Sequence, residues 1–356
     1  MAEVLLTISG EIPPEVETEI TNCRRPRADY LELAGTVGAD LLDYKRARQQ
    51  TGWVGRLLEE IGGPNLMLAW GCFRRRRHYR VIFTDGEQVG IPLAILRKFF
   101  GGQTAAHIMI AHILSVGKKM ILFDLLRLQR QIQTFVVYAT WQKRFIEERW
   151  QVPEQQVLFT PFMVDSHFFV PTAVTPQPRR MICAVGLEFR DYPTLLKAVR
   201  GLDVEVIIAA ASPWSKRADT TAGAVIPDNV TVRKFTQYEL RQLYADSLFV
   251  VMPLYEVNFQ AGVTAILEAM AMEKAIICTR TPGQTDVIVD GHTGCYVPPN
   301  DVHSLRAAIC HLLANPAQGV AMGKAGRARI EAEMSLDCYA TRLQQRVQDL
   351  LGTEEQ

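Results

Sequence analysis

The chain has 356 residues, of which 48% are hydrophobic and 22% are charged, and its formal net charge is +1. This is the composition of an ordinary globular protein, and a net charge so close to zero argues against a general attraction to nucleic acid. The length favours two domains, because single hydrophobic cores stop growing at about 250–300 residues.

The seven cysteines are scattered along the chain, and no two form a Cys-x-x-Cys pair. This pattern predicts reduced thiols in a cytoplasmic protein. The N-terminus lacks the basic and long apolar regions of a secretory signal, and no run of about 18 apolar residues is present. Neither secretion nor a membrane span is therefore predicted.

Short apolar runs alternate with helical patterns along the first half of the chain. We predict strands at 4–9, 80–85, 107–112 and 133–139, and helices at 88–100 and 141–150. Such alternation favours a parallel sheet that is covered by helices on both faces.

A basic run, FRRRRHYR at 73–80, contains Arg74, Arg75, Arg76 and Arg77. It fits the solvated end of a helix. It also fits a patch that meets anionic lipid headgroups or a phosphorylated acceptor, and such a patch would hold the protein peripherally at the inner membrane surface.

The stretch 168–180 has three prolines and no periodicity, which predicts a linker between domains. After it we predict strands at 180–186, 204–211, 230–235, 248–253 and 275–279, and helices at 192–201, 237–245 and 335–351. We therefore expect an α/β fold with two Rossmann-like domains, at 1–170 and 171–334. Their ligand-binding residues should follow the strands directly.

Gly262 is expected to open a helix, which leaves the N–H groups of Gly262, Val263 and Thr264 facing outward. Together with the helix dipole they would form an anion site. Glu268 lies deeper on the same helix among apolar residues, where an unpartnered carboxylate is costly. It would accept hydrogen bonds from two neighbouring hydroxyls, such as those of a ribose, or pair with a nearby Arg or Lys.

Two further candidates follow predicted strands. Arg190 comes shortly after Gly186, which closes the strand at 180–186. It either clamps a phosphate or pairs on the surface with Asp191. His112 closes the strand at 107–112 and either faces a ligand or is a core histidine.

Several classes of site are not indicated by the sequence. It has no His-Glu-x-x-His, Asp-x-Asp or clustered His/Cys set, so we predict no metal site. It also has no Gly-x-Ser-x-Gly elbow, no P-loop and no Gly-x-Gly-x-x-Gly after the first strand. These absences argue against a hydrolase of that fold, a P-loop ATPase and a dehydrogenase.

Residues 267–316, which begin LEAMAMEKAIICTRTPGQTD, resemble the donor-binding half of the retaining glycosyltransferases of family 4. The resemblance extends to 322–343, 184–199 and 157–171, whereas residues 1–130 match only in their alternation. It implies the GT-B fold, in which two Rossmann-like domains face each other across a cleft.

The resemblance also implies a C-terminal helix, within 335–356, that packs back on the N-terminal domain. Members of the family move a hexose from a nucleotide sugar with retention and need no bound metal or cofactor. A UDP- or GDP-sugar would be the co-substrate, and the acceptor could be a sugar, a lipid-linked sugar or a small molecule. The alternatives are a GT-B-shaped module that binds a nucleotide or a partner with little catalysis, and a sugar-nucleotide epimerase.

The resemblance assigns the donor-binding residues by position. Glu268 matches the second acid of the family's Glu-x7-Glu signature, which holds the ribose. Gly262–Thr264 fall where backbone N–H groups hold the diphosphate, and Gly186 and Arg190 lie in a turn that contacts it. Backbone groups near Phe235 would read the base.

His112, Arg190 and Gln260 are the catalytic residues that the resemblance implies. Arg190 would stabilise the leaving diphosphate, while His112 and Gln260 would orient the donor sugar. Gln260 replaces the first acid of the signature, and Leu187 replaces the usual Arg, so the sugar preference stays open. Glu273 replaces the glycine that ends the helix, at a cost of about 1 kcal/mol if that position is left-handed.

The acceptor would bind the first domain at two polar loops, 9–14 and 84–90. Gly10, Asp85 and Glu87 are the candidate residues there. The alternative is that both loops are plain strand-to-helix turns.

Overall fold

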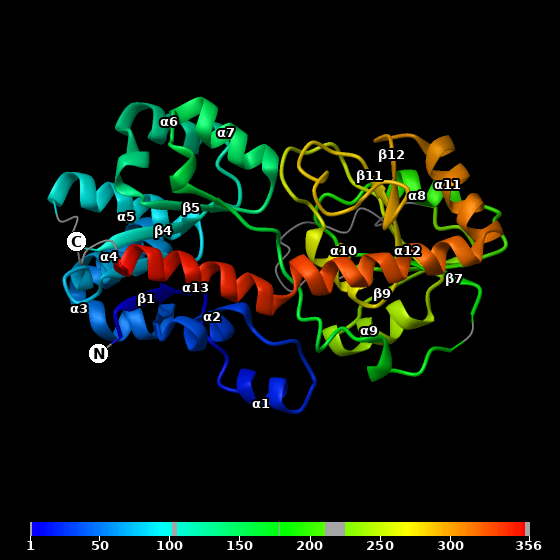
Figure 1. Cartoon of the computed structure of the whole chain (residues 1–356), viewed down its shortest axis with the longest axis horizontal. Helices are drawn as coiled ribbons and strands as arrows, with labels where there is room; N and C mark the ends of the chain where they lie inside the picture. Colours follow the sequence, from blue (N-terminus) through cyan, green and yellow to red (C-terminus); the bar gives the residue numbers. More distant parts are fainter. Residues whose placement is uncertain (1, 102–104, 178, 211–224, 353–356) are drawn as a thin grey trace. The chain divides into compact units, whose positions relative to one another are not determined.

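The computed structural model describes residues 2–101, 105–177, 179–210 and 225–352. The chain forms two compact units (Figure 1). The first unit comprises the residues up to Thr18, Arg27–Thr160 and the residues from Tyr339 onward, and the second comprises Glu19–Pro26 and Pro161–Cys338.

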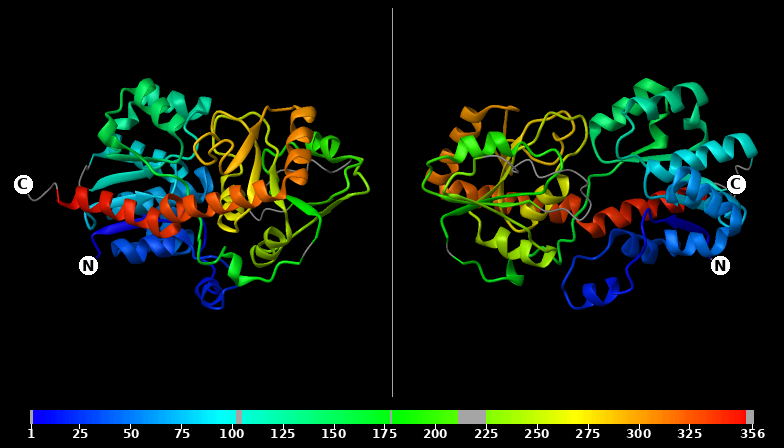
Figure 2. Two further views of the ribbon diagram at one scale, coloured as in Figure 1. Left: turned by 45° about the vertical axis from the view of Figure 1, so that its right-hand side comes forward. Right: turned by 180° about the vertical axis from the view of Figure 1, so that it is seen from behind.

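The first unit is built around a parallel sheet with strand order β2-β1-β3-β4-β5-β6. Its strands are β1 (Val4–Thr7), β2 (Asp40–Leu42), β3 (Val81–Thr84), β4 (Ala106–Ile110), β5 (Thr134–Val137) and β6 (Val157–Phe159). All residues of β1, β3 and β5 are buried, as expected for parallel strands with helices on both faces (Figure 2).

Helices pack around this sheet, and the last helix of the chain, described below, joins those named here. The helices named here are α2 (Asp29–Val37), α3 (Tyr44–Gly62), α4 (Pro64–Arg75), α5 (Glu87–Phe100), α6 (Gly117–Leu126) and α7 (Thr140–Trp150), and a further short helix, α1 (Val16–Thr21), belongs partly to each unit. The sequence patterns did not predict β2 and β6, which are only three residues long. They also did not predict the helices α3 and α4. In α3 the helical geometry is broken at Gly52, which has φ 64° and ψ −153°.

The second unit has its own parallel sheet, with strand order β12-β11-β10-β7-β8-β9. Its strands are β7 (Met181–Val185), β8 (Glu205–Ala209), β9 (Val230–Arg233), β10 (Phe249–Met252), β11 (Ala275–Thr279) and β12 (Gly294–Val297). Its helices are α8 (Tyr192–Val199), α9 (Gln237–Asp246), α10 (Val263–Ala271), α11 (Val302–Ala314) and α12 (Pro316–Arg329), and a π-helical turn (Ile330–Met334) follows them.

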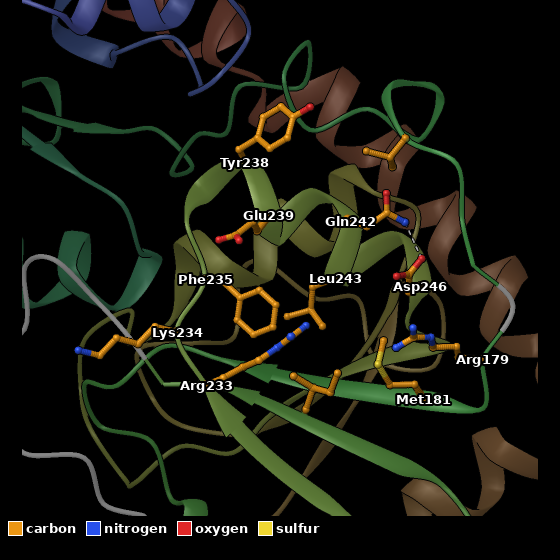
Figure 3. A pocket seen from close by; sticks show the side chains of 12 residues that line it. Arg179, Met181, Arg233, Lys234, Phe235, Tyr238, Glu239, Gln242, Leu243 and Asp246 are labelled. Atoms are coloured by element: carbon orange, nitrogen blue, oxygen red, sulfur yellow. Dashed lines mark hydrogen bonds between the residues drawn. The ribbon is translucent and has the colours of Figure 1, made fainter.

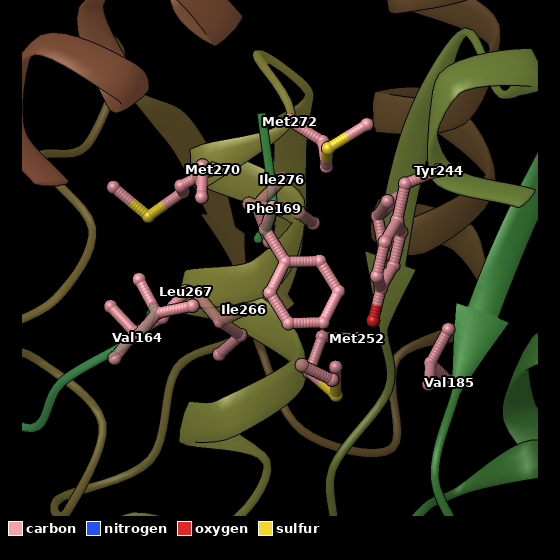
Figure 4. Packing of buried hydrophobic residues seen from close by; sticks show 14 of the residues in the cluster. Val164, Phe169, Val185, Tyr244, Met252, Ile266, Leu267, Met270, Met272 and Ile276 are labelled. Atoms are coloured by element: carbon pink, nitrogen blue, oxygen red, sulfur yellow. The ribbon is translucent and has the colours of Figure 1, made fainter. Parts of the chain in front are cut away.

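Strand register decides which side chains share a face of the second sheet. Cys183 lies opposite Ile207, and Ile207 lies opposite Thr231. Because side chains alternate between faces, Met181 and Arg233 lie on this same face. The apolar residues of this face form one buried cluster with residues of α9 and α10 (Figure 4).

The expected linker at 168–180 is wrong at its start. Phe168 and Phe169 are 5% and 1% exposed and belong to the core of the second unit. The ring of Phe169 packs edge-on against the ring of Tyr244 at 6.2 Å. The chain thus enters the second unit between Thr160 and Pro161, before the proline-rich stretch begins.

The last helix, α13 (Leu336–Gly352), begins in the second unit and continues as part of the first. Its buried side chains are spaced three or four residues apart, at Leu336, Tyr339, Ala340, Leu343 and Val347. The Tyr339 hydroxyl lies 3.0 Å from the Tyr138 hydroxyl, next to β5. One apolar stripe and this polar contact therefore attach α13 to the first unit.

Candidate functional site

The loops after β7 and β10 meet at the carboxyl edge of the second sheet, where β7 and β10 are neighbours. The N–H of Asp191 donates a hydrogen bond to the carbonyl of Pro253 at 3.0 Å. This contact holds the two loops together. Arg190, from the first loop, and Gly262, from the second, therefore belong to one site.

Two glycines make room for the side chain of Arg190. Its Nε donates to the carbonyl of Val185 at 2.9 Å, and its Nη1 donates to that of Glu188 at 2.7 Å. A Cβ on Gly186 would lie 2.4 Å from Nη2, and one on Gly262 would lie 3.1 Å from Nη1. The guanidinium is thus fixed between two backbones that no larger residue allows at these positions, which have φ +102° and +77°.

The interpretation that Arg190 pairs with Asp191 on the surface is wrong. Arg190 is only 5% exposed, and the carboxylate of Asp191 accepts a hydrogen bond from the N–H of Thr194 at 3.1 Å, which caps α8. Burial lowers the pKa of the guanidinium. An arginine so fixed and desolvated gains much from an anionic partner, because a buried charge interacts strongly with its surroundings.

The N-terminus of α10 lies beside this guanidinium. Gly262 adopts the left-handed conformation (φ 77°, ψ 4°), and no side chain caps the helix. The N–H groups of the first turn, which includes Val263 and the exposed Thr264, therefore keep the partial positive charge of the helix N-terminus. A helix terminus and a guanidinium therefore meet at one place, which is the arrangement expected for binding an anion.

Glu268 lies further along α10 and is 5% exposed. Its Oε2 accepts a hydrogen bond of 2.8 Å from the hydroxyl of Tyr244, a fully buried residue of α9. Figure 4 shows the Tyr244 side chain within the buried cluster. Burial raises the pKa of Glu268 to about 7. The partner of Glu268 is thus a tyrosine, and the alternative that this acid pairs with a nearby Arg or Lys is wrong. No pattern in the sequence indicated Tyr244.

Gln260 and Phe235 take different positions. Gln260 precedes α10 in a loop whose neighbouring Phe259 packs edge-on against Phe189 at 4.9 Å, so the loop is attached to the Arg190 turn. Phe235 follows the edge strand β9, and its side chain lines a separate pocket (Figure 3). The structure therefore brings Gly186, Arg190 and Gly262 together but not the side chain of Phe235.

In the first unit, the ends of β1, β3 and β4 form a second polar cluster. Asp85 accepts hydrogen bonds from the Thr7 hydroxyl at 2.6 Å and from the N–H of Ser9 at 2.5 Å. Burial raises the pKa of Asp85, and these hydrogen bonds oppose that shift. The carbonyl of Asp85 lies 3.0 Å from Nε2 of His112, and Gly10 lies in the turn after Ser9.

Glu87 has a supporting part in this cluster. Its carboxylate accepts hydrogen bonds from the N–H groups of His112 at 2.9 Å and Ile113 at 3.1 Å, and from Nζ of Lys119 at 2.7 Å. Burial alone would raise the pKa of Glu87, but His112 and Lys119 bring it below its usual value. His112 is partly exposed and is not a core histidine; Glu87 fixes the loop that carries it.

The basic run ends α4 beside exposed aromatic side chains. Cζ of Arg76 lies 3.8 Å from the centre of the Phe73 ring, and that ring lies 6.3 Å from the ring of Phe100. Phe99 and Phe100 are 60% and 70% exposed. Arg76 of the basic run thus lies next to an aromatic pair, Phe73 and Phe100, which the sequence patterns did not indicate.

Within residues 2–101, 105–177, 179–210 and 225–352, no helix is long and apolar enough to cross a membrane. Over the same ranges, no three His, Cys, Asp or Glu side chains are grouped as ligands for a metal ion.

Comparison with known proteins finds similarity within the second unit. Residues 184–315 match the family model of the glycosyl transferases group 1. A stretch of 61 residues is 39% identical to the GDP-mannose-dependent alpha-(1-6)-phosphatidylinositol monomannoside mannosyltransferase of Mycolicibacterium smegmatis. It covers 17% of this chain and 16% of that enzyme, so the chain aligns with only a small part of this relative.

Two solved structures match nearly the whole chain. Sucrose-phosphate synthase from Thermosynechococcus elongatus has a TM-score of 0.73 and 17% identity, over 98% of this chain and 99% of that one. Anabaena HepE in complex with UDP-glucose has a TM-score of 0.69 and 11% identity, over 98% and 99%. At such identities the likeness establishes the fold alone. The chain therefore has the GT-B fold, and residues 184–315 match the family model of the glycosyl transferases group 1.

Proposed function

We propose that the protein is a retaining glycosyltransferase that moves a hexose from a nucleotide sugar to an acceptor without a bound metal ion. The proposal rests on one observation above all. Within the residues that match the group 1 family model, the Arg190 guanidinium lies between Gly186 and Gly262 at the N-terminus of α10. A guanidinium beside a helix N-terminus is an arrangement that favours binding of an anion such as a diphosphate.

The donor would bind the second unit in three parts. The diphosphate would contact Arg190 and the N–H groups of Gly262–Thr264, and Glu268 would accept hydrogen bonds from the ribose through the oxygen that Tyr244 leaves available. The backbone near Phe235 would read the base. UDP- and GDP-sugars are the favoured donors, since HepE was solved with UDP-glucose and the mycobacterial relative is named for GDP-mannose.

Chemistry in this site would follow from charge. As the bond between the sugar C1 and the diphosphate oxygen breaks, negative charge grows on the leaving diphosphate, and Arg190 and the helix dipole stabilise it. These groups supply the positive charge that a metal ion supplies in other enzymes. A leaving phosphate oxygen then takes the proton of the acceptor hydroxyl, which attacks C1 from the same face and so retains its configuration. Gln260 would orient the sugar.

The acceptor would bind the first unit at the edge formed by Gly10, Asp85 and His112. We assign Glu87 to support of this edge, because its carboxylate is already used by three donors. The partly exposed His112 ring offers a hydrogen-bonding group for a hydroxylated acceptor. The Asp85 carboxylate accepts hydrogen bonds from Thr7 and twice from Ser9, so it would shape this edge by holding the turn after β1.

We further propose that the acceptor is lipid-linked and that the protein meets the membrane peripherally. Arg74–Arg77 would contact anionic headgroups, and Phe99 and Phe100 would enter the interface. Vesicle flotation checks this: Phe99→Ser with Phe100→Ser should release the protein from vesicles with anionic lipid. Equal flotation on neutral and anionic vesicles, or no effect of the double variant, would argue against it.

The central test is release of nucleotide from a panel of UDP-, GDP- and ADP-sugars. We expect slow hydrolysis of one donor by the wild type and its loss in Glu268→Ala. Glu205→Ala, which changes an exposed acid at the start of β8, is the matched control and should retain release. Nucleotide binding without release from any donor, even with acceptors added, would instead favour the non-catalytic binding module.

A further inference from the structure

The second unit has a pocket between α9 and the edge strand β9, with a volume of about 340 Å³ (Figure 3). Met181, Ile207, Leu243 and Phe235 supply its apolar lining. α9 packs on β7, whereas Thr231 and Arg233, which lie on the same face of the edge strand β9, are exposed. This volume lies in the range that binds small molecules, about 300–1,000 Å³.

Three cations line the same pocket: Arg179, Arg233 and Lys234. Cζ of Arg233 lies 4.3 Å from the centre of the Phe235 ring, which places its charge above the apolar floor. Nη2 of Arg179 donates to the side-chain oxygen of Gln177 at 3.2 Å, which is a neutral partner. Among the described residues, no carboxylate oxygen lies within 4.0 Å of these three cations. The charge of Arg233 still acts on Glu239, whose pKa is lowered by hydrogen bonds from Thr236 and further by Arg233.

The two acids of the lining are already engaged. Oε2 of Glu239 accepts hydrogen bonds from the N–H of Thr236 at 2.7 Å and from its hydroxyl at 2.8 Å, in the cap of α9. Asp246 accepts from the side chain of Gln242 and from the N–H of Gln177, each at 2.7 Å. The pocket therefore offers a net positive rim over an apolar floor.

We propose that this pocket binds a small molecule with an anionic group, such as a carboxylate, sulfonate or phosphate, on an apolar body. The anionic group would take charge-assisted hydrogen bonds from Arg233 and Lys234, and the apolar body would cover Ile207 and Leu243. The site is separate from the diphosphate site, because neither Arg190 nor the other diphosphate-binding residues line it.

The probe for this proposal is 8-anilinonaphthalene-1-sulfonate, an anion on an aromatic body whose fluorescence rises in apolar sites. We expect saturable binding to the full chain. Arg233→Gln with Lys234→Gln should raise the Kd about tenfold or more, which corresponds to about 1.4 kcal/mol or more. The neutral analogue N-phenyl-1-naphthylamine should bind the wild type and this double variant equally.

Two matched variants separate the pocket from the rest of the surface. Arg200→Gln with Lys324→Gln removes the same charge from exposed positions outside the pocket and should leave the Kd unchanged. Val174→Trp fills the pocket without a change of charge and should abolish binding, while circular dichroism and the unfolding midpoint stay as in the wild type. Equal weakening by both charge pairs, or binding that survives Val174→Trp, would overturn the proposal.

Saturating UDP and GDP complete the test. The dye should remain bound in their presence, since the base would contact only the backbone near Phe235, whereas the dye would contact the side chains that line the pocket. Full displacement by a nucleotide would overturn the separate site and make the pocket part of the donor site. Dye binding does not depend on turnover, so a failure of the proposed transferase activity would be distinguishable from a failure of this inference.

Discussion

Arg190 is the residue on which the proposed chemistry depends most. Its guanidinium is held by two carbonyl groups and two glycines, so it needs no reorganisation to meet a growing charge. We expect Arg190→Ala to lower kcat about 100-fold at saturating donor. Arg190→Lys should recover only part of that loss, because lysine keeps the charge but lacks the planar guanidinium that donates two parallel hydrogen bonds. Steady-state kinetics check both. A kcat that survives in Arg190→Ala, with only KM raised, would limit this residue to ground-state binding.

Glu268 links the candidate site to stability through its raised pKa. The pKa is about 7 in the folded protein against the ordinary value of 4.5 for a glutamate, so between these values the folded state holds a proton that the unfolded state has lost. Stability from this group is fully present below about pH 4.5 and falls as pH rises toward 7, by up to about 3 kcal/mol.

Glu268→Gln should remove this pH dependence, because the amide keeps the shape and cannot ionise. We expect equal stability for the two proteins near pH 4.5 and greater stability for the variant at pH 8, with a higher KM for the donor. Urea unfolding at the two pH values measures the first effect. If the variant loses stability equally at both values, burial of an ionisable carboxyl is not what limits the wild type.

The C-terminal end of α10 has a local strain that can be relieved. Glu273 has φ +57°, a left-handed conformation that costs a residue with a Cβ about 1–2 kcal/mol. The backbone of Glu273 has no room to relax, because α12 packs closely against it. A Cβ on Gly323 of α12 would lie only 1.9 Å from the Glu273 carbonyl oxygen. The helix α12 thus packs directly on this turn.

Glu273→Gly should therefore stabilise the protein by about 1 kcal/mol. Glu273→Ala is the matched control and should bring no such gain, since alanine keeps the Cβ. Chemical denaturation compares the three proteins. Equal gains in both variants would mean that the charge of Glu273, and not its backbone conformation, is what destabilises the wild type.

At the scale of the whole molecule, α13 makes the end of the chain part of the first unit. Leu343 is fully buried on its apolar stripe. Leu343→Ala should cost about 2–5 kcal/mol, through lost burial and the cavity left behind. Hydrogen exchange should show faster opening of β5 and neighbouring strands of the first unit, with the second unit little changed.

The matched variant is Leu305→Ala in α11, which is equally buried at 2% exposed but belongs to the second unit. It should open the strands of that unit and spare the first. If both variants accelerate exchange throughout the chain to the same extent, the two units unfold as one and α13 has no selective role.

The fold was largely predictable because its strands are short apolar runs that the sequence itself separates. β1, β3 and β5 are buried throughout, and such runs read as strands without further information. α3 was missed because Gly52 breaks it and because Trp53 and Ile61, at 77% and 72% exposed, blur its amphipathic pattern. Exposed apolar residues on one helix obscure the signal that predicts it.

The sequence alone determined the alternation of strands and helices, the opening of a helix at Gly262 and the presence of a buried acid at Glu268. Each depends on residues that are close together in the chain, where backbone geometry and periodicity act. Tertiary structure alone decided that Tyr244 partners Glu268 and that Thr7 partners Asp85, 24 and 78 residues away in the chain. A buried carboxyl requires a donor, but which donor reaches it depends on how the sheet places distant helices and loops side by side.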